Sequence, residues 1–252
     1  MKLSKILSSC VVTMLLGSSL FASGGSTHWG YTGHEAPQNW GELSPDYSAC
    51  KDGRSQSPIN ISKDGVVATN GLENIEFNYK TNATEVVNNG HTIQVNVKEG
   101  SSIKIDGIVF NLKQFHFHTP SENMIEGKSF PLELHLVHAS KDAELAVVAL
   151  MFEEGKENKI LGKIWDKMPH VAGDKVTCGL PSSTMNDMLP KDKSYFRFNG
   201  SLTTPPCSEG VRWFVLKEYA TISKEQIKEF FDVFGHENNR PTQPLNARKV
   251  MK

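Results

Sequence analysis

The sequence predicts a single, mainly β domain of the α+β class, in which helices are minor packing elements. Short runs of alternating apolar and polar residues, the pattern of half-buried strands, follow one another from residue 75 to residue 152. Only two segments carry the apolar period of a helix. No low-complexity linker, composition break or internal repeat divides the chain, and about 230 residues commonly form one core in all-β proteins.

The strands can be placed in order along the chain. Residues 26–62 are rich in Gly, Pro and Asn and are expected to be irregular, pinned to the main body by the aromatic side chains Trp29, Tyr31, Trp40 and Tyr47. Strands are then expected over 75–79, 84–88, 91–97, 101–105, 108–112, 114–118, 132–138 and 145–152. Asp106-Gly107 predicts a tight hairpin, and the almost wholly apolar run 145–152 predicts a buried central strand.

Two helices interrupt this pattern. Residues 156–168 place their large apolar side chains on one face. A second helix is expected to begin after Ser223, with Gln226 in the capping-box position. Four of its side chains are predicted to face inward: Ile227, Phe230, Phe231 and Phe234.

The N-terminus indicates export. Residues 1–22 carry two lysines, then an apolar run over 6–20, then small residues, which is the pattern of a cleaved secretory signal. We therefore expect a mature domain over 23–252, without a membrane span, in the periplasm or outside the cell. Removing the signal leaves 25 basic and 28 acidic residues, a net charge of about −3, with no basic block. Nucleic acids and anionic membranes are thus not expected partners.

Three cysteines remain after Cys10 leaves with the signal: Cys50, Cys178 and Cys207. In an oxidising compartment two of them are expected to pair, and the sequence leaves all three pairings open.

Three histidines carry the chemistry. Because side chains alternate along a strand, Gln114, His116 and His118 share one face. Glu133 and His135 share a face of the next strand, and the intervening turn allows the two strands to pair in antiparallel. Three imidazoles without a cysteine, leaving a position open for water, favour catalytic zinc over a structural zinc site. Gln114 and Glu133 are placed to orient the ligand rings.

A turn-rich loop follows an alternating strand that begins at Tyr195. Its hydroxyl-bearing residues, Thr203 and Thr204, can both donate and accept hydrogen bonds. Taken alone, this pattern favours a simple turn over a catalytic loop.

These motifs together resemble an α-class carbonic anhydrase of the bacterial exported type, over essentially the whole mature chain. The matching segments occur in family order: Gln-Ser-Pro-Ile-Asn at 56–60, Asn-Asn-Gly-His at 88–91, Gln-Phe-His-Phe-His at 114–118, Glu-Leu-His-Leu-Val-His at 133–138, Gly-Ser-Leu-Thr-Thr-Pro-Pro at 200–206 and Asn-Asn-Arg-Pro-Thr-Gln-Pro at 238–244. The resemblance implies a large, mostly antiparallel, twisted central sheet with short peripheral helices.

The resemblance also implies a role for individual residues. His116, His118 and His135 would bind Zn²⁺, and zinc-bound hydroxide would attack carbon dioxide to give bicarbonate and a proton. Thr203 would accept the proton of that hydroxide and donate its own to Glu122, while His91 would shuttle the released proton. Gln114, Glu133 and a group at Asn238 would orient the ligands. The substrate pocket would comprise Val137, Val147, Leu202, Thr204, Val211 and Trp213, and the solvent network Tyr31, Asn89 and Gln94.

Further expectations follow from the same resemblance. Cys50 and Cys207 would form the disulfide, closing a loop that contributes up to about 5 kcal/mol in the chain-entropy model. Cys178 is left as a buried residue, a free thiol or a link in a homodimer. Asn123 replaces a histidine found in many relatives, which is expected to weaken the outer polar network slightly. Sulfonamides and anions are expected to inhibit at the zinc.

Two other functions stand beside carbon dioxide hydration. A relative that has become a binding module typically lacks a ligand histidine, whereas this chain keeps all three. A zinc-dependent esterase would use the same hydroxide. The remaining histidines are expected to be surface or satisfied core residues: His28, His34, His138, His170 and His236.

Overall fold

The structure is a computed structural model that describes residues 27–252. The predicted signal, residues 1–22, lies outside the described residues. Within residues 27–252, none of the helices has the length and apolar character needed to cross a bilayer.

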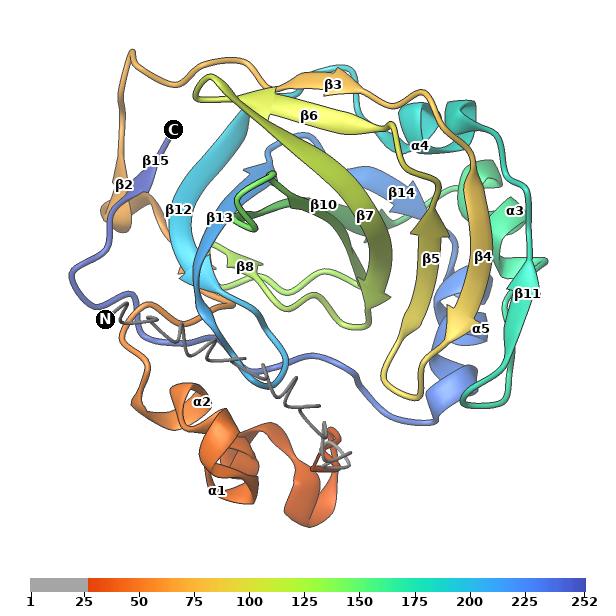
Figure 1. The fold of residues 1–252 in the computed structure, drawn as a ribbon, viewed down its shortest axis with the longest axis horizontal. Coiled ribbons are helices and arrows are strands. Elements are labelled where there is room, and N and C mark those ends of the chain that lie inside the picture. The colour runs from red at the N-terminus through yellow and green to blue at the C-terminus, as the bar shows by residue number, and fades with distance from the viewer. Residues whose placement is uncertain (1–26) are drawn as a thin grey trace, which may run out of the picture.

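One mixed sheet of thirteen strands organises the chain, as Figure 1 shows. Its main path has the order β11-β4-β5-β7-β9-β10-β13-β12-β15-β2, while β14 pairs with β10 and β6 joins β3 to β7. Within this sheet, as residues 27–252 form it, only β10–β13, β10–β14 and β15–β2 pair in parallel, so the predicted mostly antiparallel sheet is confirmed. The strands of this sheet are β2 (Val66–Val67), β3 (Glu76–Asn78), β4 (Ala83–Asn88), β5 (Ile93–Val97), β6 (Ser102–Ile105), β7 (Ile108–His118), β9 (Leu132–Ala139), β10 (Leu145–Glu154), β11 (Lys175–Thr177), β12 (Tyr195–Ser201), β13 (Glu209–Leu216), β14 (Ala220–Ile222) and β15 (Val250–Met251). A separate two-stranded ladder pairs β1 (Asn60–Ile61) with β8 (Met124–Ile125).

The helices are short and lie at the periphery (Figure 1). They are α1 (Trp40–Leu43), α2 (Ala49–Asp52), α3 (Lys159–Trp165), α4 (Ser182–Met188) and α5 (Lys224–Phe234), with four 3-10 turns between residues 33 and 65. The helix predicted over 156–168 is shorter because Asn158 caps it, accepting from the N–H groups of its first turn. The Ser223–Gln226 capping box of α5 is confirmed. Phe231 was wrongly placed inward: it is 36% exposed, since only one stripe of α5 can face the core.

Two strands that were predicted separately form one continuous strand. Residues 108–112 and 114–118 form the single strand β7, with a register shift between Leu112 and Gln114. The predicted hairpin before it is present, with Asp106 and Gly107 both at positive φ. One edge of β7 pairs with β6 at its start and with β5 farther along, while the other edge pairs with β9 on both sides of the shift.

The sheet separates two apolar clusters. Leu132, Leu134 and Leu136 of β9 belong to the larger cluster, which α3, α4 and α5 cover. His135 points from the opposite face, where a smaller cluster includes Val147 and Trp213. Each fully buried leucine contributes about 1.5–3 kcal/mol, so this alternation holds β9, and with it His135, in one register.

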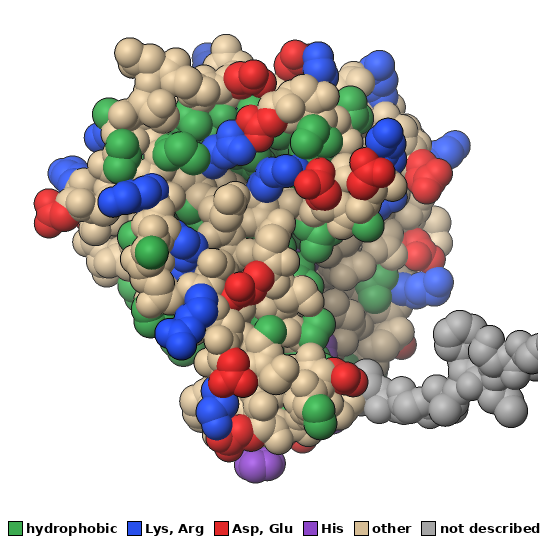
Figure 2. All heavy atoms as spheres, turned by 60° about the vertical axis from the view of Figure 1, so that its left-hand side comes forward, with side chains coloured by type: hydrophobic (Ala, Val, Ile, Leu, Met, Phe, Trp, Pro, Cys, Tyr) green, Lys and Arg blue, Asp and Glu red, His purple; other side chains and the backbone are tan. Residues whose placement is uncertain are grey.

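Charge is evenly spread on the face drawn in Figure 2. Basic and acidic side chains alternate over it, and no extended patch of one sign forms there.

His138 is a satisfied core histidine, as predicted. Its Nε2 lies 3.0 Å from the Tyr79 hydroxyl and its Nδ1 3.3 Å from the Ala146 carbonyl oxygen. The carbonyl can only accept, so Nδ1 donates to it and Nε2 accepts from Tyr79. Burial lowers the pKa of His138 to about 4.

The buried His138 predicts a loss of stability in acid. In the unfolded chain His138 has a pKa near 6.5, whereas in the native state its pKa is about 4. Between these two pH values the unfolded state binds a proton at His138 and the native state does not. This group therefore stabilises the fold fully above about pH 6.5, and about 3 kcal/mol is lost as pH falls to about 4. Urea unfolding at several pH values should show a flatter dependence in His138→Gln than in the exposed control His170→Gln. An equal slope in the two variants would contradict the assignment.

Candidate metal centre

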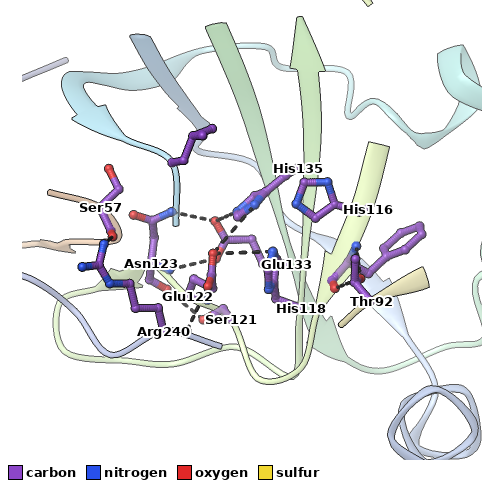
Figure 3. A network of polar contacts seen from close by, with 12 residues as sticks. Ser57, Thr92, His116, His118, Ser121, Glu122, Asn123, Glu133, His135 and Arg240 are labelled. Carbon is purple, nitrogen blue, oxygen red and sulfur yellow. Dashed lines mark hydrogen bonds and ion pairs between the residues drawn. The ribbon is translucent and has the colours of Figure 1, made fainter. Parts of the chain in front are cut away.

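Strands β7 and β9 bring the three predicted histidines together. His116 lies directly opposite His135 in their antiparallel register, and His118 lies on the same face of β7. One nitrogen from each ring lies within 4.8 Å of the others. The face of the sheet that was predicted to be polar therefore forms a compact three-nitrogen cluster, shown in Figure 3.

The two rings of β7 are oriented by acceptors on their Nδ1 atoms. His116 Nδ1 lies 2.8 Å from Gln114 Oε1, and His118 Nδ1 lies 2.7 Å from the main-chain oxygen of Asn238. Both partners are acceptors, so each Nδ1 carries the proton. This leaves both Nε2 atoms as free lone pairs. The Asn238 side chain secures its own carbonyl by bonding to the backbone of Thr119.

The third ring is turned the other way. His135 Nε2 lies 2.9 Å from Glu133 Oε1, so Nδ1 is its free nitrogen. Glu133 is fully buried, and its Oε2 accepts from the main-chain N–H groups of Glu122 and Asn123 at 2.7 and 2.8 Å. Burial raises the pKa of Glu133 to about 7, although hydrogen bonds from Asn123 act to lower it.

Asn123, which was expected to weaken this outer network slightly, makes two hydrogen bonds within it. Its side-chain amide donates to Glu133 Oε1 at 2.7 Å, and its Oδ1 accepts from the N–H of Ile59 at 3.1 Å. Because an asparagine side chain has both a donor and an acceptor, it can hydrogen-bond to two segments at once.

The cluster fits a borderline-soft cation. Burial lowers the pKa of all three histidines, most strongly those of His116 and His135, so the rings are neutral at pH 7. His118 Nε2 is buried without a hydrogen-bond partner among the described residues, an arrangement that is costly unless the nitrogen has another ligand. Three neutral nitrogens without a thiolate are typical of catalytic zinc.

A carboxylate and a hydroxyl lie beside the nitrogens. Glu122 is 1% exposed, its Oε2 lies 3.5 Å from His118 Nε2, and its Oε1 accepts from the N–H of Arg240 at 2.9 Å. Burial raises the pKa of Glu122 well above its ordinary value, and the nearby Thr203 hydroxyl opposes that rise. Thr203 is itself 5% exposed, so the pair is largely shielded from solvent.

A cavity of about 110 Å³ opens onto two of the three histidines, His116 and His118. Its lining includes several of the predicted solvent and pocket residues: Tyr31, Asn89, His91, Gln94 and Thr204. The five apolar residues predicted for the substrate wall do not line this cavity but belong to one cluster on the same face of the sheet, Val137, Val147, Leu202, Val211 and Trp213.

Comparison with known proteins identifies the family of this chain. The family model described as eukaryotic-type carbonic anhydrase matches residues 35–252. A carbonic anhydrase of Neisseria gonorrhoeae is 48% identical over 243 residues, which cover 95% of this chain and 94% of the relative.

The chain belongs to the eukaryotic-type carbonic anhydrase family.

Solved structures agree with this assignment. The α-carbonic anhydrase from Thermovibrio ammonificans, in complex with the inhibitor sulfanilamide, is 47% identical with a TM-score of 0.87, and the match covers 90% of this chain and all of that one. A hyperthermostable carbonic anhydrase from a hydrothermal vent chimney is 51% identical with a TM-score of 0.84, covering 89% of this chain and 99% of that one. The chain is therefore an enzyme of the carbonic anhydrase type, with the fold that its sequence predicted.

The predicted disulfide of this carbonic anhydrase is present. Cys50 and Cys207 are joined by an S–S bond of 2.08 Å across a separation of 157 residues. Among the described residues Cys178 remains a free thiol, partly buried against the larger cluster. The disulfide anchors the end of the loop that carries Thr203, which we call the threonine loop (residues 201–207).

Removing this disulfide is expected to destabilise the enzyme strongly. Replacing Cys50 and Cys207 together with alanine frees a 157-residue loop in the unfolded chain, which the chain-entropy model values at about 5 kcal/mol. Urea unfolding of the oxidised protein measures the difference, and Cys178→Ala serves as the control. A double variant as stable as Cys178→Ala would contradict this expectation.

Sequence reasoning missed Arg240. It lies in the quoted Asn-Arg-Pro motif, but no periodicity marked it, because its partners lie more than 180 residues away in the chain.

Proposed function

We propose that this enzyme catalyses the reversible hydration of carbon dioxide to bicarbonate and a proton, with Zn²⁺ held by His116, His118 and His135. The supporting observation is the buried cluster of three neutral nitrogens, one without a hydrogen-bond partner, beside a shielded hydroxyl–carboxyl pair. Zinc bound there supplies positive charge that favours ionised Glu122 and lowers the pKa of a coordinated water to about 7, a value established for carbonic anhydrases as a class.

The chain's own residues prepare the zinc ligands. Gln114, the carbonyl of Asn238 and Glu133 each occupy the second nitrogen of one ring. Each ring is therefore held in one tautomer and one orientation before the metal arrives, which raises metal affinity. We assign to these three groups the role of orienting the ligands.

Thr203 and Glu122 align the attacking oxygen. We assign the Thr203 hydroxyl as a donor to Glu122, because this hydroxyl acts to lower the pKa of that carboxyl. Its lone pairs would then be left to accept from the attacking hydroxide. That hydrogen bond fixes the direction of the nucleophile's remaining lone pair, and alignment of reacting groups is a positional effect of large size. The apolar cluster around Val147 and Trp213 offers carbon dioxide a surface without competing hydrogen bonds.

His91 is assigned as the proton carrier. It lies on the cavity wall, and its ring stacks on Trp29 with centroids 3.7 Å apart. Burial, followed by the nearby His28 and His236, lowers the pKa of His91, so the neutral ring is available to accept a proton near pH 7.

Replacing His91 with alanine should slow turnover in weak buffer by at least about 10-fold, because a positioned proton carrier is lost. Zinc content should stay unchanged, and added imidazole should restore part of the rate. Stopped-flow carbon dioxide hydration measures both effects, with His34→Ala as the control. Unchanged turnover in weak buffer would remove His91 from the mechanism.

Several finer proposals accompany the main one. The same nucleophile can attack an activated ester, so slow hydrolysis of 4-nitrophenyl acetate is expected. A solved relative is a sulfanilamide complex, which supports sulfonamide inhibition here. The disulfide supports an exported domain over residues 23–252 in an oxidising compartment.

Carbon dioxide hydration by the mature, oxidised protein tests the main proposal. A rate well above the buffer background that sulfanilamide suppresses is expected. A correctly folded, zinc-loaded protein that does not accelerate hydration would contradict it.

A further inference from the structure

Arg240 is a buried cation whose guanidinium group donates hydrogen bonds to neutral acceptors and lies over the Trp40 ring, 5.7 Å from its centroid. The residue is 2% exposed, and burial lowers its pKa to about 10, so it remains charged at pH 7. Nη1 donates to Gln56 Oε1 and to the Ser57 carbonyl oxygen, and Nη2 donates to the Cys50 carbonyl oxygen, each at 2.8 Å. Within residues 27–252 no carboxylate forms an ion pair with it.

The segment that receives these bonds holds the threonine loop at both ends. At one end, the N–H of Ser57 donates to Ser201 Oγ at 2.8 Å and the N–H of Ser201 donates back to Ser57 Oγ at 3.1 Å. At the other end, Gln56 Nε2 donates to the Cys207 carbonyl oxygen at 3.0 Å. Residues 56 and 57 therefore fix the position of the loop that carries Thr203.

The backbone of Arg240 binds the Glu122 carboxylate. Its main-chain N–H donates to Glu122 Oε1 at 2.9 Å, which directs Oε2 toward the histidine cluster. One residue thus bonds to Glu122 through its backbone and, through its side chain, to the segment that holds Thr203.

We propose that Arg240 is a positioning residue for catalysis, which sets the distance between Glu122 and the threonine loop. This inference rests on the proposed function, because it concerns the alignment of the Thr203 hydroxyl. The planar guanidinium reaches three acceptors in fixed directions, whereas the ammonium of a lysine is a single point of charge. A buried cation costs desolvation energy that an apolar side chain would avoid, so a role in structural specificity accounts for its presence.

The test compares Arg240→Lys with a matched control, Arg248→Lys. Arg248 also binds main-chain carbonyl oxygens, those of Leu245, Asn199 and Pro244, but in the part of the chain that the structure describes it makes no hydrogen bond to residues 56–57 or Glu122. For each protein the zinc content, the kcat and KM for carbon dioxide, and the Kd of sulfanilamide are measured well below the unfolding temperature.

Arg240→Lys is expected to keep one zinc per chain and to lower kcat by about 10-fold to 100-fold, the cost of misplacing a reacting group by about 1 Å. KM should change little, because no substrate contact is removed. The Kd of sulfanilamide should rise with the fall in kcat, since its N–H is expected to use the same acceptor at Thr203. Arg248→Lys should leave all of these values near those of the unmodified enzyme.

A purely structural role gives a different result. An Arg240→Lys enzyme with reduced thermal stability but unchanged kcat and sulfanilamide Kd would overturn the proposal. If this variant does not fold, Gln56→Leu decides: it removes one bond to the guanidinium and one to the threonine loop, and an unchanged kcat would again overturn it. Failure of the unmodified enzyme to hydrate carbon dioxide would instead reject the proposed function.

Discussion

Replacing His135 with glutamine is expected to abolish carbon dioxide hydration through loss of the metal. Removing a residue that hydrogen-bonds to a metal ligand lowers metal affinity about 10-fold to 100-fold, and removing the ligand itself should lower it further. The variant leaves His116 and His118 with two nitrogens, too few for a catalytic zinc site. Zinc per chain after dialysis, measured with the hydration rate in the same sample, checks the prediction.

His138→Gln is the matched control on the same strand. His138 lies three residues further along β9 and points to the opposite face, where it contacts Tyr79. Glutamine can still accept from the Tyr79 hydroxyl, so this variant should retain zinc and activity at neutral pH. Equal zinc loss in the two variants would show that damage to the strand, and not loss of a ligand, explains the effect.

Replacing Thr203 with alanine is expected to lower kcat by about 100-fold, since the attacking hydroxide loses the acceptor that aligns it. Zinc content should not change, because Thr203 is not a ligand. The affinity for sulfanilamide should fall with kcat. Stopped-flow hydration and inhibitor titration on the same preparation measure the three quantities.

A variant of the neighbouring Thr204 distinguishes loss of nucleophile alignment from damage to the threonine loop. Thr204 lies in the same threonine loop and lines the cavity, but its hydroxyl, unlike that of Thr203, is not among the groups that lower the pKa of Glu122. Thr204→Ala should therefore cost much less than Thr203→Ala. Equal losses would undo the assignment of Thr203.

The metal site was predictable because it follows from the two-residue period of strands. That period put His116 and His118 on one face, and the turn before residue 132 brought His135 opposite them. The large sheet was predictable in the same way. Its least accurate part was the division of β7, because the register shift after Leu112 looks like a break between strands when only the sequence is read.

Contacts between distant segments were not predictable from periodicity. His118 is oriented by the main-chain oxygen of Asn238, and a carbonyl group leaves no mark on the sequence. The partners of Asn123, Glu133 and Ile59, were likewise not visible in the sequence pattern. The place of Arg240 likewise depends on partners that only the folded chain brings together.

A zinc titration of the metal-free enzyme tests the central claim most directly. Chelated and dialysed protein receives zinc in steps, and the carbon dioxide hydration rate is recorded against zinc bound per chain. We predict a rate that rises in proportion to bound zinc and reaches its plateau at one ion per chain, held by His116, His118 and His135. Full zinc occupancy without hydration would contradict the account and favour a metal-stabilised binding protein.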